Sequence, residues 1–350
     1  MTQANIVGCI LGTAVGDAIG LPYEGLPYRR AEKLIGKPNC HHFFFGRGMV
    51  SDDTEHTYMV AQALIESGGD LDTFRRHLGF LFRFWLLGIP AGIGMATLRA
   101  ILRLWIGFSP HKSGVFSAGN GPAMRAAIIG ATIDDPQLMR DLVKASTRIT
   151  HTDPKAEYGA FAVALAAQLA RQHKTVPADQ FVDYLKSSLR EDGNELSALI
   201  VNAANSASNG QSTESYADSL GLKKGVSGYV YHTVPVAIHA WFVYPHDFRS
   251  AITSVIKCGG DTDTTGAIVG GIIGTAVGKD GIPSEWINHI LEWPRSVSWM
   301  ERLAVQVNSS INTDGKKGTI FFPVWGILPR NLFFLLIVLY HGFRRLLPPY

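Results

Sequence analysis

The chain has 350 residues, of which 46% are hydrophobic and 17% are charged, and its formal net charge is +3. This composition excludes a disordered protein, and the charge is too small and too diffuse to support nucleic-acid binding. Three widely spaced cysteines without a CxxC pair argue against a disulfide framework or a cysteine zinc site and favour a reducing compartment.

The first predicted element is an apolar, glycine-rich segment that runs to Pro22. It lacks the basic start of a signal peptide, and Asp17 interrupts its apolar run, so we expect a cytoplasmic protein. We interpret Cys9, inside this run, as a small buried core residue. Residues 11–22 are similar in sequence to residues 273–283. This similarity indicates a remote repeat or two helices that both require small residues, and we favour the second interpretation.

The segment SDDTEHTYMVAQAL, residues 51–64, predicts the start of a helix. Its first four residues all favour the N-cap, and apolar residues at helical spacing follow. Taken alone, this pattern indicates only a capped helix.

Two segments precede predicted helices in the middle of the chain, and the first of them is a loop rich in small residues. In FSAGNGPAMRAA, residues 116–127, Pro122 suits a first helical turn, and the free N–H groups could hold a phosphate or simply form an ordinary cap. In THTDPKAEYGA, residues 150–160, His151 precedes a helix that opens at Pro154. His151 is a core or capping histidine, a ligand-binding group or an acid–base catalyst.

Helical apolar spacing dominates the rest of the chain. Phe161, Leu165 and Leu169 recur every four residues, and runs with period two are scarce. We therefore predict an all-α fold. Residues 191–224 are polar and rich in small residues and are a candidate loop-bearing insertion, but we place no domain boundary there.

The segment GGDTDTTGAIVGG, residues 259–271, again places carboxylates before a predicted helix. Glycine costs ~1 kcal/mol per helical position relative to alanine, so the glycines of this helix indicate close approach to another helix. Clustered carboxylates repel each other unless protons or cations neutralise them, and Mg²⁺ prefers oxygen ligands. If the two segments meet, Asp52, Asp53, Asp261 and Asp263 are candidates for a two-ion site.

The tail, residues 319–350, is strongly apolar. A membrane span requires roughly 20 apolar residues, whereas Arg330 and Arg344 leave only thirteen residues between them. A packed C-terminal helix or an oligomer contact is favoured. Peripheral membrane attachment through aromatic residues, Arg344 and Arg345 is the alternative.

Five motifs in order resemble those of the ADP-ribosylglycohydrolase family, which includes dinitrogenase reductase-activating glycohydrolases and ADP-ribosyl-arginine and ADP-ribosyl-serine hydrolases. The motifs are GDAIGLPYE, SDDTEHT, GNGPAMR, THTDPKAEYGA and GGDTDTTGAIVGGIIG. The resemblance implies a compact, single-domain, all-α fold over residues 1–318 with a binuclear Mg²⁺ or Mn²⁺ centre.

The resemblance also implies roles for individual residues, matched motif by motif. The implied metal ligands are Ser51, Asp52, Asp53, Asp261, Asp263 and Thr264. The implied substrate-binding residues are Ser117, Gly119, Asn120, Gly121, His151 and Tyr229. Asp52, Asp53 and Glu24 are the implied candidates for the general acid or base.

The implied reaction is hydrolysis of the bond between C1″ of ADP-ribose and a protein side chain, with two Mg²⁺ or Mn²⁺ as cofactors. The expected partners are ADP-ribose and an ADP-ribosylated protein, with an arginine N-glycosidic linkage favoured, and no nucleic acid is expected. Two alternatives stay open. One is a non-catalytic ADP-ribose-binding or structural family member, and the other is a two-metal hydrolase of another ADP-ribose-containing or nucleotide substrate.

Overall fold

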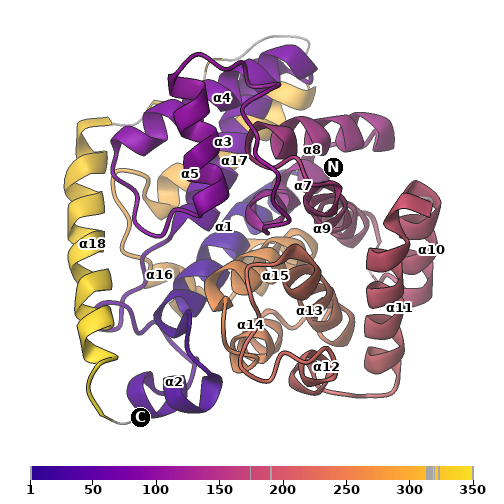
Figure 1. The fold of residues 1–350 in the computed structure, drawn as a ribbon, viewed down its shortest axis with the longest axis vertical. Helices are drawn as coiled ribbons and strands as arrows, with labels where there is room; N and C mark the ends of the chain where they lie inside the picture. The colour runs from indigo at the N-terminus through magenta and orange to yellow at the C-terminus, as the bar shows by residue number, and fades with distance from the viewer. Residues whose placement is uncertain are drawn as a thin grey trace.

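The computed structural model describes residues 2–173, 175–189, 191–312, 318, 320–321 and 324–348. Thr319, where the predicted tail begins, lies outside the described residues. The described part consists of helices joined by loops, with isolated β-bridges and no strand, so the predicted all-α fold is confirmed (Figure 1). Its helices are α1 (Gln3–Gly20), η1 (Leu21–Tyr23), α2 (Tyr28–Ile35), α3 (Asp52–Ser67), α4 (Leu71–Leu87), α5 (Met95–Trp105), α6 (Gly121–Met124), α7 (Ala127–Thr132), α8 (Pro136–Thr150), α9 (Pro154–Gln172), α10 (Ala178–Leu189), η2 (Glu191–Gly193), α11 (Asn194–Ser208), α12 (Thr213–Ser219), α13 (Val230–Val243), α14 (Phe248–Lys257), α15 (Thr262–Val277), η3 (Lys279–Gly281), α16 (Ser284–Asn288), α17 (Val297–Asn312), η4 (Val324–Gly326) and α18 (Ile327–Arg344).

Helices α1 and α15 form a central pair in which the two backbones touch (Figure 1). A Cβ atom added to Gly12 would lie 2.1 Å from the carbonyl oxygen of Gly270. One added to Gly16 would lie 2.0 Å from the carbonyl oxygen of Gly266. The predicted close helix–helix approach is therefore confirmed. The two similar stretches of sequence, residues 11–22 and 273–283, lie in and just after these two helices.

Other helices surround this pair and bury most of the apolar residues in one cluster. Helix α9 packs against α7, α8, α13 and α15, and its predicted apolar face, with Phe161, Leu165 and Leu169, is buried. Cys9 is also buried, as expected for a core residue.

The polar region at residues 191–224 is largely helical. It contains η2, α11 and α12, and α11 packs against α13 in the body of the domain. The hypothesis of a loop-bearing insertion is therefore wrong, because small residues such as Ala203 and Ala204 form the buried face of α11.

Two helical segments among the described residues are long and apolar enough to cross a membrane. The first, Gln3–Tyr23, contains the central helix α1, and 83% of its most apolar 18-residue window is buried. The second, Val324–Arg344, contains α18, and only 28% of its window is buried. Helix α18 runs along the left edge of the molecule in Figure 1. One face of α18 is buried against the domain, and its other face is exposed to solvent.

Candidate active site

The two carboxylate-bearing segments meet at the N-terminal ends of α3 and α15. The Thr264 hydroxyl lies 3.4 Å from Oδ2 of Asp53 and donates a hydrogen bond to it. Ser51 is the N-cap of α3, and its hydroxyl accepts a hydrogen bond from the Asp53 N–H and donates one to Oδ2 of Asp53, at 3.3 and 3.0 Å. The predicted helix starts are confirmed, and the condition for a carboxylate cluster is met.

A cavity of about 540 Å³ opens at this junction. Its walls come from seven parts of the chain that are distant in sequence. They are Glu24 and Gly25; Asp52 and Asp53; Gly92, Gly94, Met95, Ala96 and Thr97; Ser117, Gly119, Asn120, Gly121 and Met124; His151; and Val226, Ser227, Gly228, Gly260, Asp261, Asp263 and Thr264, where the last group joins two neighbouring loops. The fold therefore brings together most of the residues that the motifs single out.

The carboxylates of the cavity are crowded and poorly solvated. Burial, followed by the charges of neighbouring carboxylates, raises the pKa of Asp52, Asp53 and Asp263 well above the usual range. Desolvation of the carboxyl and the nearby Asp261 also raise the pKa of Glu24. Such a cluster requires protons or cations to neutralise it.

The oxygen donors of this cluster suit a hard divalent cation. Oδ1 of Asp53 and Oδ1 of Asp263 are buried and have no hydrogen-bond partner. Carboxylate and hydroxyl oxygens are the ligands that Mg²⁺ prefers. However, no three His, Cys, Asp or Glu side chains within the described ranges are arranged as a complete metal-binding group. The types of donor atom nevertheless fit a divalent cation.

Asn120 connects the glycine-rich loop to α15. Its side-chain amide donates to Oδ2 of Asp261 at 2.6 Å and to the Thr233 hydroxyl at 3.0 Å. Its backbone N–H donates to the Gly228 carbonyl at 2.9 Å. Helix α6, which follows, is a single turn with Pro122 in its first turn, as predicted. Asn120 thus fixes the carboxyl group of Asp261 and the shape of the loop together.

The family model described as ADP-ribosylglycohydrolase matches residues 1–317. The chain belongs to the ADP-ribosylglycohydrolase family. The resemblance seen in the motifs is therefore confirmed.

Individual relatives agree with this assignment. An uncharacterized protein of Archaeoglobus fulgidus is 32% identical over 307 residues, covering 85% of this chain and 94% of the relative. The ADP-ribosyl-(dinitrogen reductase) glycohydrolase of Rhodospirillum rubrum is 29% identical over 297 residues, covering 81% and 89%. A solved chain titled ADP-ribosylglycohydrolase-related protein complex superposes with a TM-score of 0.65 at 24% identity, covering 88% of this chain and 98% of that one. This structural likeness supports the fold.

His151 lines the cavity as a neutral side chain. Burial and the nearby Arg125 guanidinium lower the pKa of His151 to about 3. Its Nδ1 lies 2.9 Å from the Thr150 hydroxyl, and its Nε2 faces Gly119, where an added Cβ would lie 3.0 Å away. A glycine at position 119 therefore leaves room for the imidazole at the cavity wall.

Two of the residues implied by the family motifs lie outside the cavity wall. Ser51 is buried behind Asp53 and acts there as the helix cap. Tyr229 precedes α13, and its hydroxyl accepts a hydrogen bond from Nζ of Lys155 at 3.0 Å. The neighbouring Gly228 lines the cavity in place of the tyrosine ring.

Several residues at this site were not assigned from the sequence. Oδ2 of Asp17, in α1, accepts hydrogen bonds from the Ser51 N–H and the Thr54 hydroxyl at 2.9 and 2.5 Å, and burial raises the pKa of Asp17 to about 7. An aspartate within an apolar glycine-rich run was the available signal. The buried Arg125 donates to the Gly121 carbonyl at 2.9 Å and to the Thr150 hydroxyl at 2.7 Å, so it fixes two walls of the cavity.

The tail also reaches the edge of the site. A guanidinium nitrogen of Arg345 lies 3.9 Å from the position of a Cβ on Gly25, and another donates to the Pro22 carbonyl at 3.1 Å. The motifs gave no signal for this contact, because the tail lies beyond the residues that the family model matches.

Proposed function

We propose that this chain is a metal-dependent hydrolase that removes ADP-ribose from modified protein side chains. The observation that carries the proposal is the convergence of Glu24, Asp52, Asp53, Asp261 and Asp263 on one cavity. A glycine-rich loop with Gly119 and Gly121 also lines that cavity. A cavity of about 540 Å³ falls within the usual size of sites for small molecules and cofactors.

The proposed metal ligands are the oxygen donors at the starts of α3 and α15. They are Ser51, Asp52, Asp53, Asp261, Asp263 and Thr264, which would hold two Mg²⁺ or Mn²⁺. Bound ions of this kind supply positive charge that polarises oxygen atoms of the substrate and of water. Asn120 assists by holding one oxygen of Asp261, which leaves the other oxygen available.

The glycine-rich loop is the proposed seat of the ribose and diphosphate. Ser117, Gly119 and Gly121 line the cavity, and the lack of side chains at the two glycines lets a ligand approach the backbone. The neutral His151 forms the wall behind this loop without placing a charge there.

Glu24 is the residue that we propose to exchange the proton of the reaction. Glu24 is the most exposed residue of the cluster, and partial desolvation and the nearby Asp261 raise the pKa of its carboxyl group. This group is therefore suited to hold a proton and to pass it to a leaving group. Asp52 and Asp53 are the other candidates, although both lie deeper, among the proposed metal ligands.

An arginine linkage is the favoured substrate within this proposal. The leaving group would then be a guanidine that takes up a proton, and a carboxylate-rich cavity is complementary to that cation. The name of the Rhodospirillum rubrum relative states that it acts on ADP-ribosylated dinitrogen reductase, which supports a protein substrate for this chain as well.

The test measures release of ADP-ribose from arginine-modified and serine-modified proteins, with Mg²⁺, Mn²⁺ or EDTA. We expect metal-dependent release from the arginine-modified protein and a loss of about 100-fold or more in Asp261→Asn. Asp280→Asn makes the same change at an exposed position beyond the other end of α15 and should behave as wild type. Calorimetry with Mg²⁺ alone reports metal binding independently.

Each other outcome contradicts a defined part of the proposal. Release from the serine-modified protein alone would overturn the arginine linkage. Binding of ADP-ribose without release from either protein would indicate a non-catalytic binding protein. Hydrolysis of a free nucleotide or of another ADP-ribose compound, but not of modified protein, would indicate the other two-metal hydrolase.

A further inference from the structure

The exposed face of α18 is apolar along the whole helix. We use the name α18 face for six exposed side chains at helical spacing: Leu328, Leu332, Leu336, Leu339, Tyr340 and Phe343. The polar residues of the helix point the other way, because Arg330 and Asn331 are buried against the body of the domain. A surface helix in water has the opposite arrangement, with its polar side outward. Large exposed apolar patches of this kind mark surfaces that contact a membrane or another molecule.

Polar contacts on the inner face fix the rotation of α18. The Arg330 guanidinium donates to the Val50 carbonyl at 2.6 Å and pairs with the buried Glu292. The Asn331 amide donates to the Gly88 carbonyl at 2.7 Å. Turning the helix to hide its leucines would break these buried contacts. The helix is therefore held flat along the domain, an orientation suited to lying on a surface rather than crossing a membrane.

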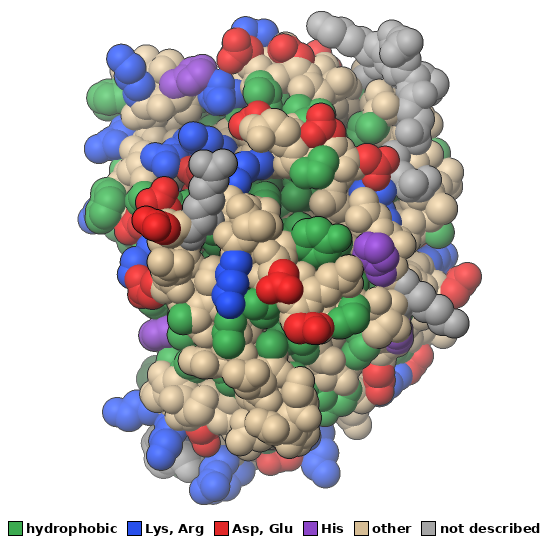
Figure 2. All heavy atoms as spheres, turned by 90° about the vertical axis from the view of Figure 1, so that its right-hand side faces the viewer, with side chains coloured by type: hydrophobic (Ala, Val, Ile, Leu, Met, Phe, Trp, Pro, Cys, Tyr) green, Lys and Arg blue, Asp and Glu red, His purple; other side chains and the backbone are tan. Residues whose placement is uncertain are grey.

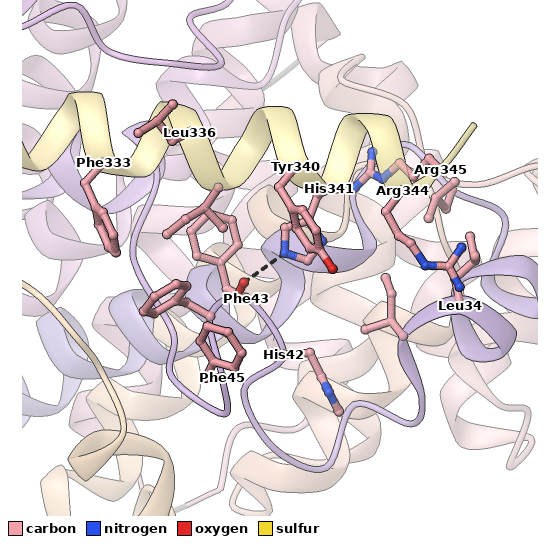
Figure 3. Close-up of a pocket in the computed structure, with 14 residues that line it drawn as sticks. Leu34, His42, Phe43, Phe45, Phe333, Leu336, Tyr340, His341, Arg344 and Arg345 are labelled. Atoms are coloured by element: carbon pink, nitrogen blue, oxygen red, sulfur yellow. Dashed lines mark hydrogen bonds between the residues drawn. The ribbon is translucent and has the colours of Figure 1, made fainter. Parts of the chain in front are cut away.

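An apolar groove of about 510 Å³ borders the α18 face (Figure 3). Its far side is the turn that contains Phe44 and Phe45, and the ring of Phe44 packs edge-on against Phe333 with centroids 5.1 Å apart. Phe45 lies at the tip of this turn and is 94% exposed. The turn thus extends the apolar surface and adds a protruding aromatic side chain.

The permanently charged side chains that line the groove and the turn are all basic. Residues 315–350 and residues 43–51 contain no Asp or Glu. Arg344 and Arg345 line the groove, and the exposed Arg47 follows Phe45 in the turn. By contrast, the side of the molecule that carries α10 and α11 shows acidic and basic side chains together (Figure 2). The α18 face is therefore complementary to a negatively charged, apolar surface.

We propose that the α18 face docks on an anionic phospholipid bilayer, with α18 lying flat in the interface. Leucines and aromatic rings enter the boundary between headgroups and acyl chains, and the bordering arginines contact anionic headgroups. A second copy of the chain is the less suitable occupant. In a symmetric dimer the same face meets itself, and residues 43–51 and 315–350 offer no carboxylate to pair with the arginines of the other copy.

The test is flotation of the full-length protein with vesicles of phosphatidylcholine alone or mixed with phosphatidylglycerol. We expect the protein to float with the mixed vesicles. Leu339→Glu should weaken this binding about tenfold, because a charge replaces an inserted apolar side chain. Arg344→Gln should weaken it about fivefold on mixed vesicles only, since the lost contact is electrostatic.

A matched control is Tyr184→Glu on α10, at the opposite edge of the molecule in Figure 1. Tyr184 is 43% exposed and Leu339 is 48% exposed, so both changes place a carboxylate at a similar surface position. Circular dichroism checks that each variant is folded, and Phe343→Ser is a second variant of the face.

Three results would overturn the proposal. The first result is that the folded wild type does not float with mixed vesicles. The second is that folded Leu339→Glu and Phe343→Ser both bind these vesicles as well as Tyr184→Glu does. The third result is a dimer seen by light scattering that Leu339→Glu dissociates, in a protein that binds no vesicles. That result would assign the face to a second copy of the chain.

Discussion

Replacement of Gly12 by alanine tests whether contact between the α1 and α15 backbones holds the domain together. The new Cβ would lie 2.1 Å from the Gly270 carbonyl oxygen. Because that oxygen belongs to the backbone of a buried helix, it cannot rotate away as a side chain would. The two helices must therefore move apart by about 1 Å, and a gap of that size forfeits a quarter to a half of each dispersion contact.

The expected cost combines two opposing effects. Overpacking of a buried contact costs about 3 kcal/mol at the upper end of the usual range. Alanine returns about 1 kcal/mol through its higher helix propensity. The net loss is then about 2 kcal/mol. With an unfolding entropy of about 2 cal/mol/K per residue over the whole chain, this loss lowers Tm by about 3 °C.

The matched control is Gly342→Ala in α18. Gly342 is also helical, but an added Cβ would meet no heavy atom within 4 Å. Only the propensity effect then acts, and Tm should rise by about 1 °C. Calorimetry and urea unfolding of both variants give the comparison. If Gly12→Ala is as stable as the wild type or more stable, the argument from backbone contact is wrong.

Three further predictions concern single buried groups. Burial lowers the pKa of His239 to about 4. Between about pH 6.5 and about pH 4 the unfolded chain therefore binds a proton at this residue that the native state does not bind. The free energy of unfolding falls by up to about 3 kcal/mol as the pH drops through this range. His239→Gln should reduce the stability lost between about pH 7 and about pH 4.5 in urea titrations. Arg330→Met leaves Glu292 buried without its cation and should cost about 3–5 kcal/mol by urea unfolding, part of which Glu292→Gln should restore. Asn120→Ala removes the hydrogen bond to Asp261 and should weaken Mg²⁺ binding about tenfold by calorimetry, whereas unchanged affinity would exclude this positioning role.

The starts of α3 and α15 could be predicted from the sequence because helix capping is a local property. Ser51 and Asp261 are the N-caps that the two motifs indicate, and the glycines of α15 correctly predicted a close helix neighbour. Neither motif carries information about its distance from the other. That the two segments meet depends on the long-range packing of α3 and α15 around α1, which local patterns do not contain.

The features that the sequence did not reveal were missed because local patterns do not record them. Helix α1 is buried on nearly every side, so its apolar spacing does not define a face and does not predict where Asp17 points. The loop with Gly92 and Gly94 lines the cavity without any acid or base, so it has no chemical signature in the sequence. Apolar residues occupy most of both faces of helix α18, so the contacts of Arg330 and Asn331 with the domain determine which face is exposed.

The glycine contacts also fix the axial position of the carboxylates. Asp17 follows Gly16 in α1, and Asp263 lies three residues before Gly266 in α15, so the contact between these two glycines lies within one turn of both carboxylates. The Thr262 hydroxyl adds a hydrogen bond of 2.9 Å to the Gly20 carbonyl at the same end. A shift of one residue along the helix axis would move Asp263 by about 1.5 Å relative to Asp17 and would break these contacts. Larger side chains at the glycine positions would also fill the core, but they would not hold α1 and α15 at this axial position relative to each other. The glycines of α1 and α15 are therefore part of the site, because they position carboxylates that they do not contact.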